Sequence, residues 1–198
     1  MELVRRAYVL GDRAVAITDH VDFTNIEHVL LSQMRIKGNI GWDIVVLVGV
    51  ELTHIPVDKI PRLASKAREL GAEIVVGHGE TPVEPVEEGT NRAYIECGDV
   101  DILAHPGKLN VEDAEKARDA GVFLELTSRH GHKKGNRDVA GAALKAKAKM
   151  LVDTDAHAPE DLITQRQAYR IALDSGLDRK TALETVVKNP EDLLKRLI

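Results

Sequence analysis

Several residue types are scarce in this chain of 198 residues, and each scarcity excludes a class of protein. The single cysteine, Cys97, excludes an internal disulfide framework and is typical of a protein kept in a reducing cytoplasm. No apolar run approaches the roughly 18 residues of a membrane-spanning helix, and no signal-peptide pattern is present. Aromatic residues make up only 3%, so the core must consist of Val, Ile, Leu and Ala. The net charge of −5 gives no general attraction to nucleic acid or an anionic membrane. These absences predict a cytoplasmic protein.

What remains is the composition of a globular protein, with 43% hydrophobic and 30% charged residues. The length favours one domain covering residues 1–198. Six short apolar runs predict strands over Arg13–Ile17, Ile44–Val50, Glu73–Gly77, Asp101–Ala104, Val122–Thr127 and Met150–Val152. Helical spacing ahead of and between them predicts helices over Met1–Leu10, Asn25–Ile36, Ile55–Leu70, Thr90–Cys97, Val111–Ala120 and Asp138–Lys147, with further helices in Asp161–Ile198.

Alternating strands and helices predict an α/β fold with a parallel sheet and right-handed crossovers. The strands lack a polar face, which indicates that both faces of the sheet are covered. Polar, metal-competent residues follow at least five of the strands. Only a barrel brings so many carboxyl ends around one axis, so we predict a closed or nearly closed TIM-like barrel rather than an open sheet.

The residues at these strand ends are the types that bind borderline divalent ions. The candidates are His20, Glu51, His78, His105, Asp155 and His157. Four imidazoles and two carboxylates suit Zn, Mn or Fe better than Mg or Ca. Because these ligands exceed the roughly four that one ion needs, we predict two or three ions. A multinuclear site lowers the pKa of a bridging water and binds phosphoryl oxygens, which favours phosphoester hydrolysis.

Other polar residues leave alternatives open. Arg129 either binds a substrate phosphate or neutralises nearby acids, and His130 and His132 either join it or lie in an exposed loop. Asp19 either orients His20 or only ends its strand, and Glu125 either supports a ligand or caps a helix. The residues expected to be structural or solvated are His28, His54 and Cys97, and Thr81–Gly89 is expected to be a surface loop.

Five segments together resemble the PHP (polymerase and histidinol phosphatase) domain family, across essentially the whole chain. They are Thr18-Asp19-His20, Gly49-Val50-Glu51, Gly77-His78, Ala104-His105-Pro106 and Asp153-Thr154-Asp155-Ala156-His157. The resemblance is closest to small stand-alone phosphoesterases and implies a distorted (βα)7 barrel with a trinuclear site. It implies that Glu51 bridges two ions, with His78 and His105 on one of them and Asp155 on the second. His20 and His157 would bind the third.

The sequence departs from this family at its start. The family opens with a strand carrying His-x-His, whereas Met1–Leu10 corresponds to the family's first helix. We therefore expect six strands, a first strand lost from the start of the gene, and unpaired sheet edges through which copies could associate as a homo-oligomer.

The predicted function is metal-dependent hydrolysis of a small phosphate monoester or nucleotide by a hydroxide bridging the ions. Glu51, Asp155 and His157 would be catalytic and Arg129, His130 and His132 would bind substrate. Two alternatives remain: a metal-binding but inactive PHP domain, and a PHP-like scaffold subunit of an RNA-processing complex. Nucleic acid is expected at most as a short oligonucleotide or nucleotide substrate, and no membrane partner is expected.

Overall fold

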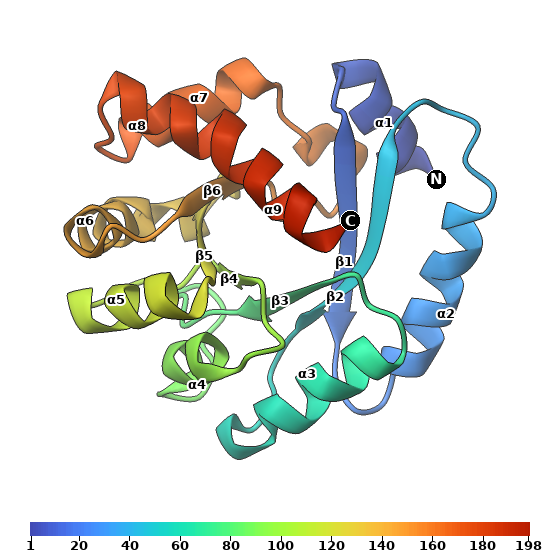
Figure 1. Ribbon diagram of the computed structural model, residues 1–198, viewed down its shortest axis with the longest axis horizontal. Helices are drawn as coiled ribbons and strands as arrows, with labels where there is room; N and C mark the ends of the chain where they lie inside the picture. Colours follow the sequence, from blue (N-terminus) through green and yellow to red (C-terminus); the bar gives the residue numbers. More distant parts are fainter.

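The centre of the molecule is one parallel sheet of six strands that follow each other in chain order. The computed structural model describes residues 1–198. The strands are β1 (Ala14–Val21), β2 (Val45–Leu52), β3 (Ile74–His78), β4 (Ile102–Ala104), β5 (Phe123–Thr127) and β6 (Met150–Asp153). The sheet curls into a half-barrel with most of its helices outside (Figure 1). The predicted α/β architecture and its six strands are therefore confirmed.

Two strands run further than their apolar residues indicated. β1 and β2 pair over eight residues, so that His20 lies opposite Glu51 and Asp19 opposite Val50. A neighbouring strand in register supplies backbone partners for polar positions as readily as for apolar ones. His20 and Glu51 thus belong to the strands themselves, and the backbone holds them in place.

Helices alternate with the strands, and most of them cover the outer face of the sheet (Figure 1). They are α1 (Glu2–Leu10), α2 (Ile26–Lys37), α3 (Ile60–Glu69), α4 (Thr90–Glu96), α5 (Val111–Ala120), α6 (Asn136–Ala146), α7 (Gln165–Asp174), α8 (Arg179–Leu183) and α9 (Asn189–Leu197). Short 3₁₀ turns occupy Val57–Lys59, His132–Gly135 and Pro159–Asp161, and a π-helical turn, Glu184–Lys188, joins α8 to α9. None of these helices is long and apolar enough to cross a membrane.

The curled sheet has a hydrophobic core on each face. A cluster of 33 buried residues fills the space between the sheet and the outer helices. A cluster of eight lies on the inner face, where β-strand side chains such as Leu47, Ile102 and Phe123 meet Leu193 of α9. Leu194 and Leu197 of the same helix pack against this cluster. Apolar side chains therefore fill the part of the interior next to α9, whereas the predicted site residues lie at the carboxyl ends of the strands.

The sheet is a half-barrel that does not close. The prediction of a closed or nearly closed barrel is wrong in that respect, whereas the predicted TIM-like curl and the unpaired sheet edges are confirmed. β1 pairs only with β2 and β6 only with β5, so one edge of each is free. Closing a sheet requires a matched number, tilt and stagger of strands, with about eight strands for an interior that side chains can fill. Ala16 and His20 of β1 are consequently exposed on the side of the opening.

Candidate metal centre

The six predicted donors converge at the carboxyl end of the sheet. His20, Glu51 and His78 belong to β1, β2 and β3, and His105 directly follows β4. Asp155 and His157 lie in the loop after β6, which ends at Asp153. The loop backbone brings these two side chains together, with Nδ1 of His157 3.5 Å from Oδ1 of Asp155.

The donors form three overlapping triads whose ligand atoms lie within 4.8 Å of one another. The triads are His20 with Glu51 and His78, His20 with Asp155 and His157, and Glu51 with His105 and Asp155. His20, Glu51 and Asp155 each belong to two triads, so the six residues form a continuous ring. Glu51 lies between two triads, as a bridging ligand does. His78 and His105, which the resemblance assigns to one ion, fall in different triads.

The spacing of the donors fits shared ions. Nε2 of His20 lies 3.4 Å from Oε2 of Glu51, and Nε2 of His105 lies 3.3 Å from Oε1 of Glu51. Two ligand atoms on one tetrahedral ion are about 3.3–3.6 Å apart for typical bond lengths. Oε1 of Glu51 and both ring nitrogens of His105 are buried without a hydrogen-bond partner. Because buried polar atoms rarely lack partners, these orphaned atoms suit a group with positive charge between them.

The backbone is strained at two of the six candidate donors. His105 has φ of 27° and Asp155 has φ of 45°, a region that residues other than glycine rarely adopt. Such conformations cost roughly 1–3 kcal/mol each and persist where the surroundings impose them. Glu125 is one such constraint, because its Oε2 accepts a hydrogen bond of 2.5 Å from the His105 amide. Of the two roles left open for Glu125, the structure shows support of a candidate ligand.

Burial and mutual charge shift the ionisation of the donors. Burial raises the pKa of Glu51, but His105 and His20 outweigh it and hold the pKa below its ordinary value. Burial lowers the pKa of His105, yet Glu51, Glu125 and Asp155 raise it to about 9. Burial and the charge of Glu51 raise the pKa of Asp155. Without an ion, bound protons and protonated imidazoles balance the negative charge of the carboxylates. An ion that takes over this role is expected to displace those protons.

The residues predicted to bind substrate lie beside this ring, in different environments. Nε of Arg129 is 3.3 Å from Oδ2 of Asp155, and its Nη1 donates to the Asp155 carbonyl at 3.1 Å. Arg129 therefore neutralises an acid in this structure, one of the two roles left open for it. His132 was placed in an exposed loop by one interpretation, but it is only 4% exposed and its ring lies 4.6 Å from that of His105. His130 lines a cavity of about 430 Å³ next to Arg129.

Sequence reasoning missed one residue at the centre and misjudged another. His54, expected to be structural or solvated, is exposed, with φ of 55° and its ring centroid 6.0 Å from that of His78. Glu84, in the loop taken as a surface segment, has Oε2 3.2 Å from Nε2 of His78. Asp19 does not orient His20, because successive strand residues face opposite sides and its Oδ2 accepts from Gln33 of α2 at 2.7 Å.

Comparisons with known proteins give one strong relative and one weak one. No protein-family model matches the chain. An uncharacterized protein of Methanocaldococcus jannaschii is 51% identical over 201 residues, covering 99% of this chain and 91% of that protein. A protein of Caldanaerobacter subterraneus named as a probable phosphatase is 27% identical over 216 residues, covering 98% and 84%.

Solved structures share the fold at low sequence identity. A chain in the structure of archaeal ribonuclease P with mature tRNA superimposes with a TM-score of 0.73 at 16% identity, over 99% of this chain and 87% of that one. A prolidase complexed with N-methylphosphonate-L-proline gives 0.63 at 12%, covering 96% and 65%. Identities this low establish a TIM-like fold and nothing about activity.

Proposed function

The chain belongs to the family of the uncharacterized Methanocaldococcus jannaschii protein, and from its candidate site we propose that it is a metal-dependent phosphoesterase. The proposed substrate is a small phosphate monoester or nucleotide. The name of the Caldanaerobacter relative, a probable phosphatase, supports the same chemistry.

One observation carries the proposal: a ring of four imidazoles and two carboxylates in which buried Glu51 is shared between triads. Oε1 of Glu51 and Nε2 of His105 face each other at 3.3 Å without forming a hydrogen bond. The donor set suits Zn, Mn or Fe. Ions bound there would act as Lewis acids toward water and the phosphoryl oxygens, which is the chemistry of phosphatases with several metals.

The residues around the ring have separate tasks in this proposal. Glu51, held in register opposite His20 by the strand pairing, fixes the spacing of the donors. Arg129 lies within 3.6 Å of Asp161 as well as close to Asp155, so it has two carboxylate contacts to exchange for a substrate phosphate. Its planar guanidinium suits bidentate contact with phosphate oxygens.

A cavity next to Arg129 would receive the organic part of the ester. Its volume is about 430 Å³, within the range of small-molecule sites. The lining is polar apart from one side chain: Ser128, Arg129, His130, Thr154, Asp161 and Ile163. A polar leaving group fits this lining better than a large apolar one.

A second candidate, a metal-binding protein without turnover, is favoured by the opening in the sheet. The side chains of His20 and His157 are 40% and 51% exposed, on the side where β1 and β6 are unpaired. Ions held there would have fewer protein ligands than those at Glu51 and His105. Metal content and turnover must therefore be measured separately.

The test uses the chain with Zn or Mn added, measuring bound metal by elemental analysis and hydrolysis of p-nitrophenyl phosphate. We expect at least one bound ion and turnover, and we expect Glu51→Gln to lose metal and reduce kcat/KM by roughly 100-fold or more. The control is His28→Gln, which alters an exposed histidine of α2. A folded chain that binds no ion would refute the proposal, and one that binds ions without turnover would establish the second candidate.

A further inference from the structure

The loop between β3 and α4 brings a carboxylate to one ring nitrogen of a candidate ligand. Oε2 of Glu84 lies 3.2 Å from Nε2 of His78, while the other ring nitrogen of His78, Nδ1, is buried without a partner. The His78 side chain is fully buried and that of Glu84 is 45% exposed. The imidazole therefore has one nitrogen directed to a fixed acceptor at the surface and one available on its buried side.

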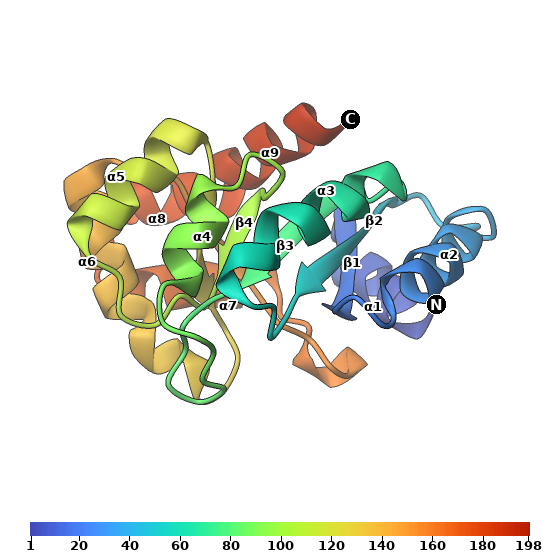
Figure 2. The same cartoon turned by 90° about the horizontal axis from the view of Figure 1, so that it is seen from below.

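This loop is held in place independently of Glu84. At its base, Oε1 of Glu80 accepts hydrogen bonds from the amides of Gly89 and Asn91, at 3.0 and 2.9 Å. Near its tip, Val83 packs on the β5–α6 loop, where a Cβ added at Gly131 would lie 3.3 Å from a Val83 methyl. Figure 2 shows both loops projecting from the same end of the sheet. These contacts anchor the chain on either side of Glu84 and so hold its carboxylate next to His78.

We propose that Glu84 is a positioning residue for the metal centre: its carboxylate accepts the Nε2–H of His78 and leaves the Nδ1 lone pair free to bind an ion. A neutral imidazole carries one ring proton, and the acceptor on one nitrogen decides which nitrogen keeps it. Histidines that bind metal usually donate their other N–H to a carboxylate or carbonyl, and loss of that partner weakens metal affinity about 10–100-fold. The inference rests on the proposed metal centre and adds a residue outside the ring of six donors.

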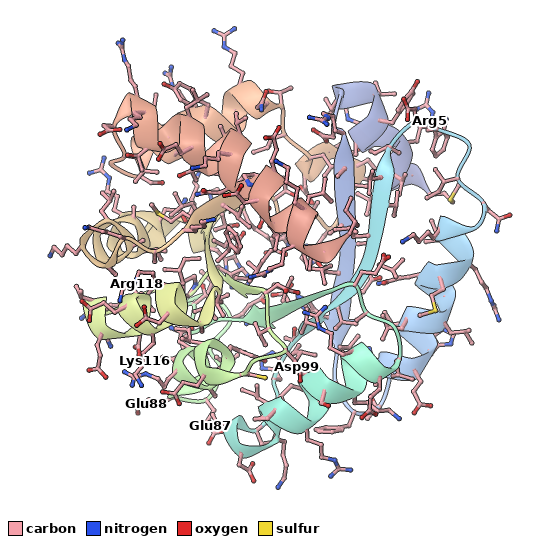
Figure 3. The ribbon with its side chains drawn as sticks, in the orientation of Figure 1. Arg5, Glu87, Glu88, Asp99, Lys116 and Arg118 are labelled. Carbon is pink, nitrogen blue, oxygen red and sulfur yellow. The ribbon has the colours of Figure 1, made fainter.

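The β3–α4 loop offers a matched control. Glu88 is an exposed acid of this loop, and Figure 3 shows it with Glu87 at the periphery of the molecule. Glu87 is unsuitable because its carboxylate accepts from the Val57 amide. Glu88→Ala removes the same charge from the same loop without touching His78, so it reports any effect of the loop's overall charge.

The first measurement is the affinity for Mn or Zn, titrated into the metal-free chain. We expect Glu84→Ala to weaken binding of one ion about 10–100-fold, Glu84→Gln to weaken it less because the amide oxygen can still accept, and Glu88→Ala to leave it unchanged. Equal losses in Glu84→Ala and Glu84→Gln would indicate a charge effect and overturn the proposal. Complete loss of one ion equivalent in both variants would make Glu84 a ligand itself and would also overturn it.

The second measurement needs no ion, so it separates this inference from the proposed function. Nitrogen-15 chemical shifts of the histidine rings, with His78 assigned through His78→Gln, report which nitrogen carries the proton. We expect His78 of the metal-free chain to be protonated at Nε2, and Glu84→Ala to give a mixture of the two forms. A His78 protonated at Nδ1 in the unaltered chain would contradict the proposal even if the chain binds metal and hydrolyses phosphoesters.

Discussion

Replacing Tyr94 with phenylalanine removes one hydroxyl from the wall behind the candidate metal centre. Tyr94 of α4 is fully buried, and its hydroxyl donates a hydrogen bond of 2.6 Å to the carbonyl of Leu52. Leu52 directly follows Glu51 and is paired with Gly77, the residue before His78. A Cβ added at Gly77 would overlap the Tyr94 ring. One side chain therefore braces the ends of two strands that carry donors.

The expected cost follows from these contacts. Tyr94→Phe keeps the ring and removes the donor to a buried carbonyl, which costs about 1–2 kcal/mol. In a chain of this length each kcal/mol corresponds to roughly 2–4 °C in Tm, so Tm should fall by about 2–8 °C. Gly77→Ala keeps the hydroxyl but forces the ring aside, at about 1–3 kcal/mol. The cost of Gly77→Ala should fall by about 1 kcal/mol in a Tyr94→Leu background, because the ring that the added Cβ overlaps is then absent.

Thermal and denaturant unfolding followed by circular dichroism would measure these free energies of unfolding. Tyr169→Phe is the matched control, because Tyr169 of α7 is partly buried and should change stability by less than about 0.5 kcal/mol. The reasoning fails if Tyr94→Phe is neutral, or if Gly77→Ala costs the same with tyrosine and with leucine at position 94.

Two further predictions concern residues away from the centre. Asp101 is buried and accepts hydrogen bonds from Arg68 at 2.5 Å and from Arg196 at 3.0 Å, so Asp101→Asn should lower the free energy of unfolding by about 2–3 kcal/mol. Denaturant unfolding measures this loss, and the control Asp99→Asn should change stability little. An equal loss in both variants would rule out the ion pairs as the cause. Burial raises the pKa of the Cys97 thiol above its ordinary 9.0, so the folded chain retains a proton that the unfolded chain releases, and stability should fall as pH rises past 9.0. Cys97→Ala should remove that part of the pH dependence, and rapid labelling of the native thiol by a disulfide reagent at pH 8 would contradict it.

The strands and the positions of the six candidate donors were predictable because local sequence determines them. The run Val45–Leu52 is almost wholly apolar and carries Glu51 as its next-to-last residue, and in a parallel sheet all carboxyl ends meet at one edge. Position in the sheet then brings Glu51 to His20 and His105 regardless of their separation in the chain. The opening in the sheet was expected only through the family resemblance, because an apolar run does not report whether the first and last strands pair.

The residues that were missed or misjudged depend on contacts with other segments of the chain. Glu84 has the sequence surroundings of a solvated acid, and only the anchoring of its loop by Glu80 and Val83 brings it to His78. Asp19 was misjudged because its partner, Gln33, is a helix residue whose buried amide gives no signal of its own.

The chain-order pairing of the strands has a consequence for how the centre is assembled during synthesis. Each strand pairs with the one made just before it, so the sheet can grow in the order of translation. His20, Glu51 and His78 are present once β3 has formed, whereas the other two triads both require Asp155, which follows the last strand. A growing chain would thus expose one donor triad while the rest of the ring is still missing. Ions captured at that stage would bind a partial set of ligands and would be the easiest to exchange until β6 is in place.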